Sequence, residues 1–194
     1  MKQSSVLWTL ASKSPRRLAL LRQIGINPIV IVPGIIETED ATDPHLLALK
    51  NAKLKANAVR NQVNRGILLA ADTIVIFDGE IIGKPGSESE AALQLKILSN
   101  QWHEVISGYF LENRQTNMSV EGTVVTKVHF RQISSAEIED YTDSGEPFDK
   151  AGGYGIQGLA ASFVNRIEGC YFNVVGLPLS RIVQDVQLLL NDNF

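Results

Sequence analysis

The longest apolar run in the chain constrains its fold more than any other feature. It covers residues 67–77 and is interrupted only at Asp72 and Thr73. Such a run, followed directly by the two-residue turn signal Asp78-Gly79, predicts a strand that continues into a hairpin. A carboxylate within this strand is costly to bury without partners. Asp72 is therefore either an aspartate that caps a loop at a strand end or a metal ligand or general base.

The remaining segments alternate irregularly between predicted strands and predicted helices. This order favours a mixed α/β sheet over a plain doubly wound one. Apolar runs predict strands at residues 6–11, 29–32, 80–82, 102–111 and 123–131, and a further strand from Leu159 that turns as a hairpin at Glu168-Gly169. Caps and periodicity predict helices that begin at Ser14, Asp43 and Ser87, and helices at residues 136–142 and 179–190.

Composition excludes several classes of protein. A chain of 194 residues can build one good core, or two lobes that share a sheet. The net charge of −3 provides no field that would hold a polyanion, so we expect no nucleic-acid partner. The single cysteine excludes an internal disulfide framework. The apolar run at residues 6–11 is too short for a signal peptide or a membrane span, so we expect a cytoplasmic protein with no membrane partner.

Two arginines stand at the start of the first predicted helix, where acidic residues are normally favoured. Ser14 is a good N-cap, and Pro15 suits the first helical position. Arg16 and Arg17 then lie in the first turn, beside free backbone N–H groups and the positive end of the helix dipole. Two cations are unfavourable there unless an anion joins them. The segment therefore predicts a phosphate site.

The second predicted helix places two polar residues among apolar ones. Leu47, Leu54 and Ala58 share one side of this helix, and Asn51 and Lys55 fall in the middle of the apolar arc. One explanation is a lysine that extends past the edge of the core to reach water. The other is a lysine that points into a cleft and meets an anion.

Three further segments are candidates for the same chemistry. Lys84 follows the hairpin and could return a cation to Asp72, while Glu37 is either a ligand or a surface acid. Residues 153–158 match G-x-G-x-x-G, but a polar loop precedes them and a predicted strand follows, so we reject a dinucleotide site. We expect these glycines to let the backbone approach a ligand, and Gln157 to offer its amide to a base edge.

In their order along the chain, these motifs closely resemble the Maf family of nucleotide pyrophosphatases. The resemblance extends from Leu10 to about Leu179 and departs at Asn100, where the family usually has glycine. We expect asparagine to keep the left-handed turn there, and the neighbouring Trp102 to alter a cleft rim or a dimer surface. The matching segments are LASKSPRR at 10–17, Glu37, Lys55-Ala56, ADTIV at 71–75, GKP at 83–85, SGEP at 144–147, DKAG at 149–152, YGIQG at 154–158 and VVGLPL at 174–179.

The resemblance implies an enzyme that hydrolyses nucleoside triphosphates to the monophosphate and pyrophosphate with a divalent cation, Mg²⁺ or Mn²⁺. It also implies that Asp72 accepts the proton of the attacking water and that Glu37 and Asp72 bind the metal. The YGIQG segment is similar to that of the branch acting on dTTP and UTP, with modified pyrimidine nucleotides as further substrates. The implied substrate-binding residues are Ser12, Arg17, Lys55 and Lys84, with Arg16, Thr73 and Gln157 assigned to base choice.

For the fold, the resemblance implies a single Maf-like domain over residues 1–194. It would be an elongated mixed β-sheet with flanking helices, similar to ITPases, with two lobes around a central cleft, and would form a homodimer. A nucleotide-binding regulator of cell division or septum formation is the alternative function, and a general phosphatase is a third. The presence of Asp72, Lys84 and Glu37 favours the enzyme, because a binding module needs no general base.

Overall fold

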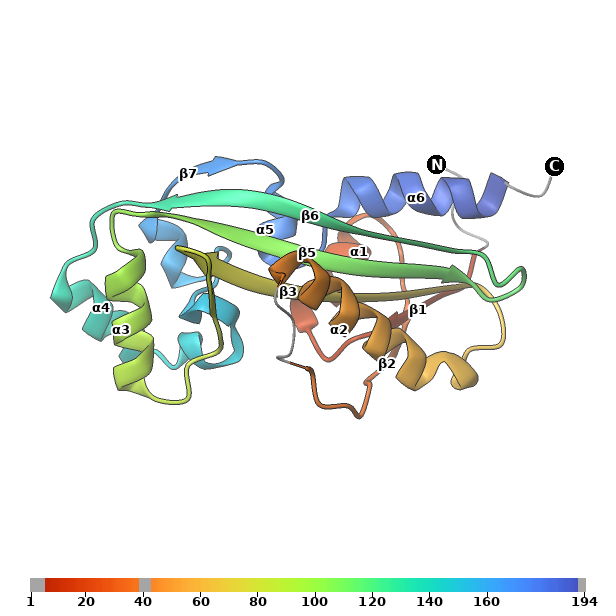
Figure 1. Ribbon diagram of the computed structural model, residues 1–194, viewed down its shortest axis with the longest axis horizontal. Helices are drawn as coiled ribbons and strands as arrows, with labels where there is room; N and C mark the ends of the chain where they lie inside the picture. Colours follow the sequence, from red (N-terminus) through yellow and green to blue (C-terminus); the bar gives the residue numbers. More distant parts are fainter. Residues whose placement is uncertain (1–5, 39–42, 192–194) are drawn as a thin grey trace. The chain divides into compact units, whose positions relative to one another are not determined.

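The computed structural model describes residues 6–38 and 43–191 (Figure 1). The described residues form two compact units. Unit 1 contains residues 6–38, 43–72, 107–124 and 176–191, and unit 2 contains residues 73–106 and 125–175. None of the described helices is long and apolar enough to cross a membrane.

The expected α/β class, a mixed sheet with flanking helices, is confirmed. The sheet order is β2-β1-β3-β5-β6-β7, with β4 paired to β3. β1 pairs in parallel with β2 and β3, whereas β4 and β7 run antiparallel to β3 and β6. The strands are β1 (Trp8–Ala11), β2 (Ile29–Ile31), β3 (Ile67–Phe77), β4 (Glu80–Ile82), β5 (Trp102–Asn113), β6 (Ser119–Phe130) and β7 (Val164–Glu168). The helices are α1 (Pro15–Gln23), α2 (Pro44–Val59), α3 (Glu88–Leu98), α4 (Ser135–Asp143), α5 (Tyr171–Val175) and α6 (Leu179–Asn191), and the 3₁₀ segments are η1 (Arg60–Gln62), η2 (Glu146–Asp149), η3 (Ala151–Gly153) and η4 (Leu159–Phe163).

Two turn predictions from the sequence are confirmed. Asp78 and Gly79 both have positive φ, 52° and 83°, and join β3 to β4 as a two-residue hairpin turn. Asn100 has a φ of 59°, so it keeps the left-handed turn expected at this position.

The predictions for the segment after the glycine-rich loop are wrong in two respects. Leu159 begins the 3₁₀ segment η4, not a strand, and β7 starts only at Val164. Ala160 and Phe163 are both buried, and this spacing of three fits a 3₁₀ turn. No hairpin forms at Gly169, because β7 pairs with β6 and Gly169 leads into α5.

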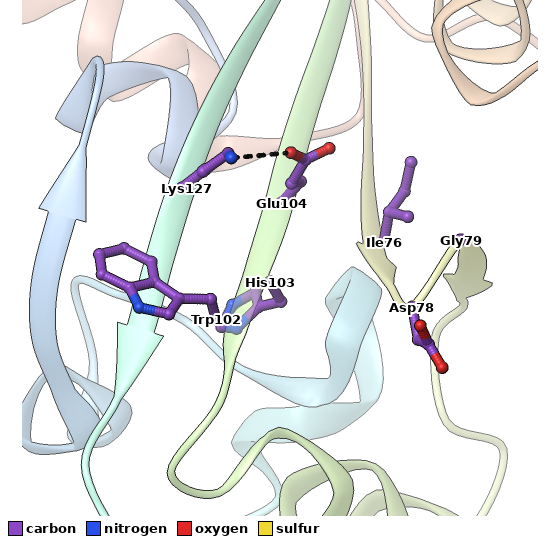
Figure 2. A pocket seen from close by; sticks show the side chains of 7 residues that line it. All are labelled: Ile76, Asp78, Gly79, Trp102, His103, Glu104 and Lys127. Carbon is purple, nitrogen blue, oxygen red and sulfur yellow. Dashed lines mark ion pairs between the residues drawn. The ribbon is translucent and has the colours of Figure 1, made fainter.

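Unit 2 combines a buried aromatic cluster with one open pocket. Phe130 packs edge-to-face against His103, Tyr154 and Phe163. The pocket, of about 380 Å³, contains none of the predicted site residues (Figure 2). Its lining residues are Ile76, Asp78, Gly79, Trp102, His103, Glu104 and Lys127. Trp102 lies on this pocket with its ring against that of His129.

In unit 1, helices cover both faces of the sheet. Gly108 and Tyr109 are consecutive in β5 and therefore face opposite sides. A Cβ at Gly108 would lie 2.4 Å from the carbonyl carbon of Ala48, so the backbone of α2 rests directly on this strand. On the other face, the Tyr109 hydroxyl donates a hydrogen bond to Asp185 of α6.

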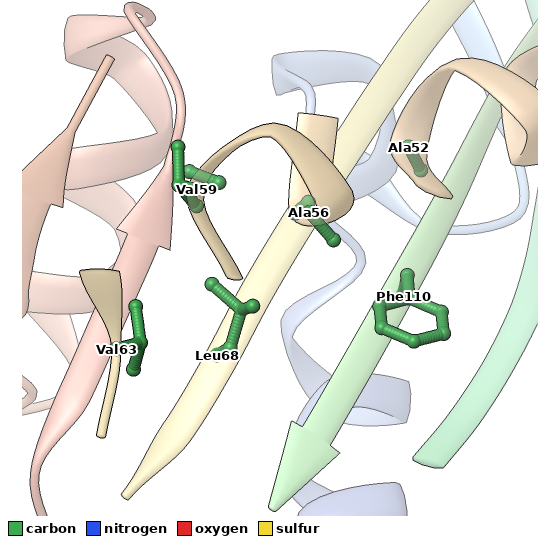
Figure 3. Packing of buried hydrophobic residues seen from close by; sticks show 8 residues of the cluster. Ala52, Ala56, Val59, Val63, Leu68 and Phe110 are labelled. Atoms are coloured by element: carbon green, nitrogen blue, oxygen red, sulfur yellow. The ribbon is translucent and has the colours of Figure 1, made fainter. Parts of the chain in front are cut away.

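The core between α2 and the sheet is built largely from small side chains (Figure 3). Small residues let a helix approach a sheet closely, so that short polar side chains at the same interface can meet. Leu68 and Ala70 of β3 belong to this core, and strand alternation places Asp72 on the same face. The cluster consists of Ala11, Ala52, Ala56, Val59, Val63, Leu68, Ala70 and Phe110.

Candidate active site

Asp72 is a buried carboxylate with two side-chain partners. It lies within β3 and is only 6% exposed. Its Oδ1 accepts a hydrogen bond from Lys55 Nζ at 2.6 Å, and its Oδ2 accepts one from Asn51 Nδ2 at 3.3 Å. These contacts offset the cost of burying the charge. Asp72 does not cap a loop, so that interpretation of the sequence is wrong.

Helix α2 supplies both partners from consecutive turns. Asn51 and Lys55 are 3% and 6% exposed, whereas Leu54 is 37% exposed and Ala58 also faces solvent. The predicted apolar side is therefore wrong for Leu54 and Ala58. The helix turns Ala52 and Ala56 toward the sheet instead, because only small residues fit where its backbone rests on β5. Lys55 does not extend to water, so that explanation is wrong as well.

Lys55 joins two carboxylates from different segments. Its Nζ lies 2.7 Å from Glu37 Oε1 and 2.6 Å from Asp72 Oδ1. Glu37 follows β2 in the chain, and its side chain is 36% exposed, against 8% for Asp72. The buried ammonium thus bridges one fully enclosed acid and one acid that reaches the surface.

Asn51 holds the segment that carries Glu37. Its Oδ1 accepts a hydrogen bond from the Thr38 backbone N–H at 2.9 Å, and its Nδ2 donates to the Thr38 carbonyl oxygen at 3.1 Å. One amide therefore fixes the backbone beside Glu37 and also contacts Asp72. Asn51 is not among the residues predicted to act at the site. The available signal was its place beside Lys55 on the apolar arc.

The predicted start of α1 is confirmed and directs Arg17 inward. Ser14 caps the helix by accepting from the Arg17 backbone N–H at 3.5 Å, and Pro15 is the first helical residue. The buried Arg17 guanidinium donates from Nε to the Gly176 carbonyl oxygen at 2.9 Å and from Nη1 to Ser12 Oγ at 3.3 Å. Ser12 therefore orients Arg17. Arg16, the next residue toward the N-terminus, is half-buried.

The charged side chains of Arg17, Glu37 and Asp72 influence one another. Burial lowers the pKa of Arg17, while attraction to Asp72 and Glu37 opposes that shift. An arginine remains protonated in either case. Within unit 1, the cations Arg17 and Lys55 thus face the carboxylates Glu37 and Asp72, an arrangement suited to binding an anion together with a metal ion.

The other three predicted substrate-binding residues belong to unit 2. Thr73 follows Asp72 in β3 and is half-buried, whereas Lys84 and Gln157 are exposed. The segment of Lys84 is fixed at its neighbour Gly83, whose carbonyl oxygen accepts from the Gly152 backbone N–H at 3.0 Å. Gln157 lies in a turn closed by a hydrogen bond of 3.0 Å from Gly158 N–H to the Gly155 carbonyl oxygen.

Comparison with known proteins identifies the family. Residues 8–189 match the family described as Maf-like protein. The chain belongs to the Maf family. It is 46% identical over 178 residues to the dTTP/UTP pyrophosphatase of Carboxydothermus hydrogenoformans, covering 92% of this chain and 96% of that protein.

Other Maf relatives are also named dTTP/UTP pyrophosphatase. The dTTP/UTP pyrophosphatase of Syntrophomonas wolfei is 46% identical, covering 89% of this chain and 92% of its own. That of Thermococcus onnurineus is 47% identical, covering 88% and 91%. Among solved structures, the Staphylococcus aureus Ham1 protein has a TM-score of 0.41 at 18% identity, covering 62% of this chain and 71% of its own.

The two acidic residues that contact Lys55 suit a hard divalent cation. The carboxylates of Glu37 and Asp72 both contact the single nitrogen of Lys55, so their oxygens are close neighbours. Across residues 6–38 and 43–191, no group of three or more His, Cys, Asp or Glu side chains could hold a metal ion. Mg²⁺ is commonly bound by one or two carboxylates together with substrate phosphates, so a pair of acids is a fitting donor set.

Proposed function

We propose that this member of the Maf family hydrolyses dTTP and UTP between the α- and β-phosphates, releasing the monophosphate and pyrophosphate. The proposal rests on the burial of Lys55 between the Glu37 and Asp72 carboxylates. Arg17 is also attracted electrostatically to both carboxylates. The identity of 46% to a dTTP/UTP pyrophosphatase, over nearly the whole of both chains, supports the substrate class.

Asp72 is the proposed general base for the attacking water. Lys55 and Asn51 fix the direction of its carboxylate, and each carboxylate oxygen can still accept a second hydrogen bond. A positioned carboxylate of this kind can accept the proton of a water molecule as the water attacks phosphorus.

The cations of the site are proposed to bind the triphosphate. Arg17 and Lys55 neutralise the negative charge that phosphoryl-transfer chemistry must stabilise, and Lys84 of unit 2 is proposed to join them. The buried Ser12 hydroxyl keeps Arg17 in its orientation. Because the guanidinium is held in advance, little reorganisation is needed when the anion binds.

Glu37 and Asp72 would hold Mg²⁺ or Mn²⁺. When bound, such an ion would neutralise charge on the phosphate oxygens. Base choice is assigned to Arg16, Thr73 and Gln157. The Gln157 amide offers one donor group and one acceptor, which match the neighbouring carbonyl and N–H of the thymine or uracil edge.

The test is the substitution Asp72→Asn, assayed with dTTP and Mg²⁺. Removal of the general base should lower kcat by about 100-fold or more, while the circular dichroism spectrum stays that of the wild type. Asp78→Asn is the matched control, because it makes the same change in an exposed turn and should leave kcat unchanged. Wild-type turnover in Asp72→Asn would overturn the assignment of the base. Tight dTTP binding without any product in the wild type would favour a nucleotide-binding regulator.

A further inference from the structure

The turn that presents Gln157 is held on both sides by the hydrogen-bonded side chains of Glu146 and Tyr141. We define the Gln157 turn as residues Gly155–Gly158. Glu146, at the start of η2, accepts a hydrogen bond at Oε2 from the Leu159 backbone N–H at 3.0 Å. Its Oε1 accepts one from the Tyr141 hydroxyl at 3.1 Å. The Tyr141 hydroxyl in turn accepts from the Gly155 backbone N–H at 3.2 Å.

The Tyr141 hydroxyl is suited to this bridging role. Burial, together with the nearby Glu146 carboxylate, raises the pKa of Tyr141. The phenol therefore keeps its proton for donation to Glu146, and its oxygen remains available to the Gly155 N–H. Glu146 thus fixes the backbone two residues before Gln157 through Tyr141 and two residues after it directly.

The glycines of the turn leave room for this carboxylate. A Cβ at Gly158 would lie 2.1 Å from Glu146 Oε1, so a side chain there would push the carboxylate away from its present position. A Cβ at Gly155 would lie 2.6 Å from Lys150 Cε, and the Lys150 ammonium donates to the Glu146 carbonyl oxygen at 2.6 Å. The G-x-x-G spacing of the turn therefore fits the approach of Glu146 and Lys150 rather than a helix start.

We infer that Glu146 is a positioning residue for base selection, which holds the Gln157 turn so that the Gln157 amide meets the pyrimidine edge in one orientation. The inference rests on the proposed function, in which Gln157 contacts the base. An exposed side chain on an unrestrained turn would have to be ordered by each substrate that binds. A turn that is already fixed removes that cost for the substrate it fits.

Glu146→Gln distinguishes the hydrogen-bonding role of the Glu146 carboxylate from its role in packing. It keeps the shape of the side chain but replaces one acceptor oxygen by an NH₂ donor. The Tyr141 hydroxyl can rotate to suit either atom, but the Leu159 backbone N–H cannot. The amide therefore turns its oxygen to the Leu159 N–H and its NH₂ to the Tyr141 oxygen, and both anchors lose the carboxylate charge, which makes such hydrogen bonds about twice as strong as neutral ones.

The first experiment measures steady-state kinetics with dTTP and with dCTP, whose base edge has the reverse donor and acceptor order. Glu146→Gln should raise KM for dTTP with little change in kcat, and should lower the dTTP-to-dCTP preference about tenfold. In a Gln157→Ala background, Glu146→Gln should change the preference no further. Glu137→Gln is the matched control, because Glu137 also holds a backbone N–H, that of Ser134 in the α4 cap, but away from this turn. It should leave the preference unchanged.

The second experiment needs no substrate. Amide hydrogen exchange at Gly155 and Leu159 should accelerate about tenfold or more in Glu146→Gln and stay at the wild-type rate in Glu137→Gln. Unchanged exchange at both amides, or faster exchange with an unchanged preference, would overturn the inference. A wild type inactive on dTTP would instead contradict the proposed function, and exchange would still decide whether Glu146 holds the turn.

Discussion

Lys55 is the residue on which the charge balance of the site depends. Its ammonium is buried between Glu37 and Asp72 and forms an ion pair with both carboxylates. Removal of one member from a buried ion cluster leaves charge without compensation, which costs far more than the loss of a surface pair.

Lys55→Met should therefore destabilise the fold by about 3 kcal/mol, measured by urea unfolding at neutral pH. Added Mg²⁺ should restore more stability to this variant than to the wild type, because the two carboxylates would then share the metal. Lys53→Met is the matched control, since Lys53 lies on the same helix and its exposed pair with Glu121 of β6 should contribute less than about 1 kcal/mol. Equal losses in the two variants would show that Lys55 is not the central cation.

At this scale the sequence indicated the unusual residues but not their contacts. Asp72 and Lys55 were visible as charges within apolar patterns, and the resemblance supplied a role for Glu37. The place of Asn51 on the apolar arc does not predict its partner, because its amide pairs with the backbone of Thr38, which follows a different strand. That contact depends on how β2 and α2 are placed in the fold.

Among the elements, the close approach of α2 to β5 builds the site. Gly108 allows it, because any side chain there would meet the α2 backbone at Ala48 and Leu49. Small residues of the helix continue the contact, so Asn51 and Lys55 reach Asp72 with hydrogen bonds of 3.3 Å and 2.6 Å.

Gly108→Ala should displace α2 and destabilise the fold by about 3 kcal/mol, measured by thermal unfolding. Activity at a temperature where the variant is still folded should also fall, since Asn51 and Lys55 would move away from Asp72. Gly86→Ala is the control, because the nearest atom to its added Cβ is the Glu90 carboxylate at 3.5 Å. A Gly108→Ala protein with wild-type stability would mean that α2 does not rest on β5.

A second element-scale prediction concerns His103 in β5. Burial, with a smaller effect from His129, lowers the pKa of His103 to about 3. Below pH 6.5 the unfolded chain binds a proton that the folded protein does not, so stability falls with falling pH until about pH 3. Relative to His103→Gln, the wild type should lose about 2 kcal/mol between pH 7 and pH 5, measured by urea unfolding. Parallel stability curves for the two proteins would contradict this assignment.

Elements with strong local signals were predicted well. Asp78-Gly79 and Asn100 specify their turns through backbone preference alone, and both predictions are confirmed. The α2 face was predicted wrongly because periodicity favoured Leu54, whereas close packing on the sheet selects alanine. The strand predicted after Gly158 is wrong for a similar reason. Ala160 and Phe163 are buried three residues apart, and this spacing fits the 3₁₀ segment that forms instead.

For the whole molecule, the Maf family explains why the predicted residues are spread along the chain. The family match covers residues 8–189 and so includes both units. Unit 1 contains the clustered charges proposed for the triphosphate and water, and unit 2 contains the Gln157 turn proposed for the base. Two statements stay predictions from the resemblance: that the chain forms one Maf-like domain with two lobes, and that it forms a homodimer.

The most direct test of the central claim is the product balance of the wild type with dTTP and Mg²⁺, followed by ³¹P nuclear magnetic resonance. Cleavage between the α- and β-phosphates predicts dTMP and pyrophosphate in a one-to-one ratio, with no orthophosphate. Release of orthophosphate with dTDP would instead identify a phosphatase and contradict the account.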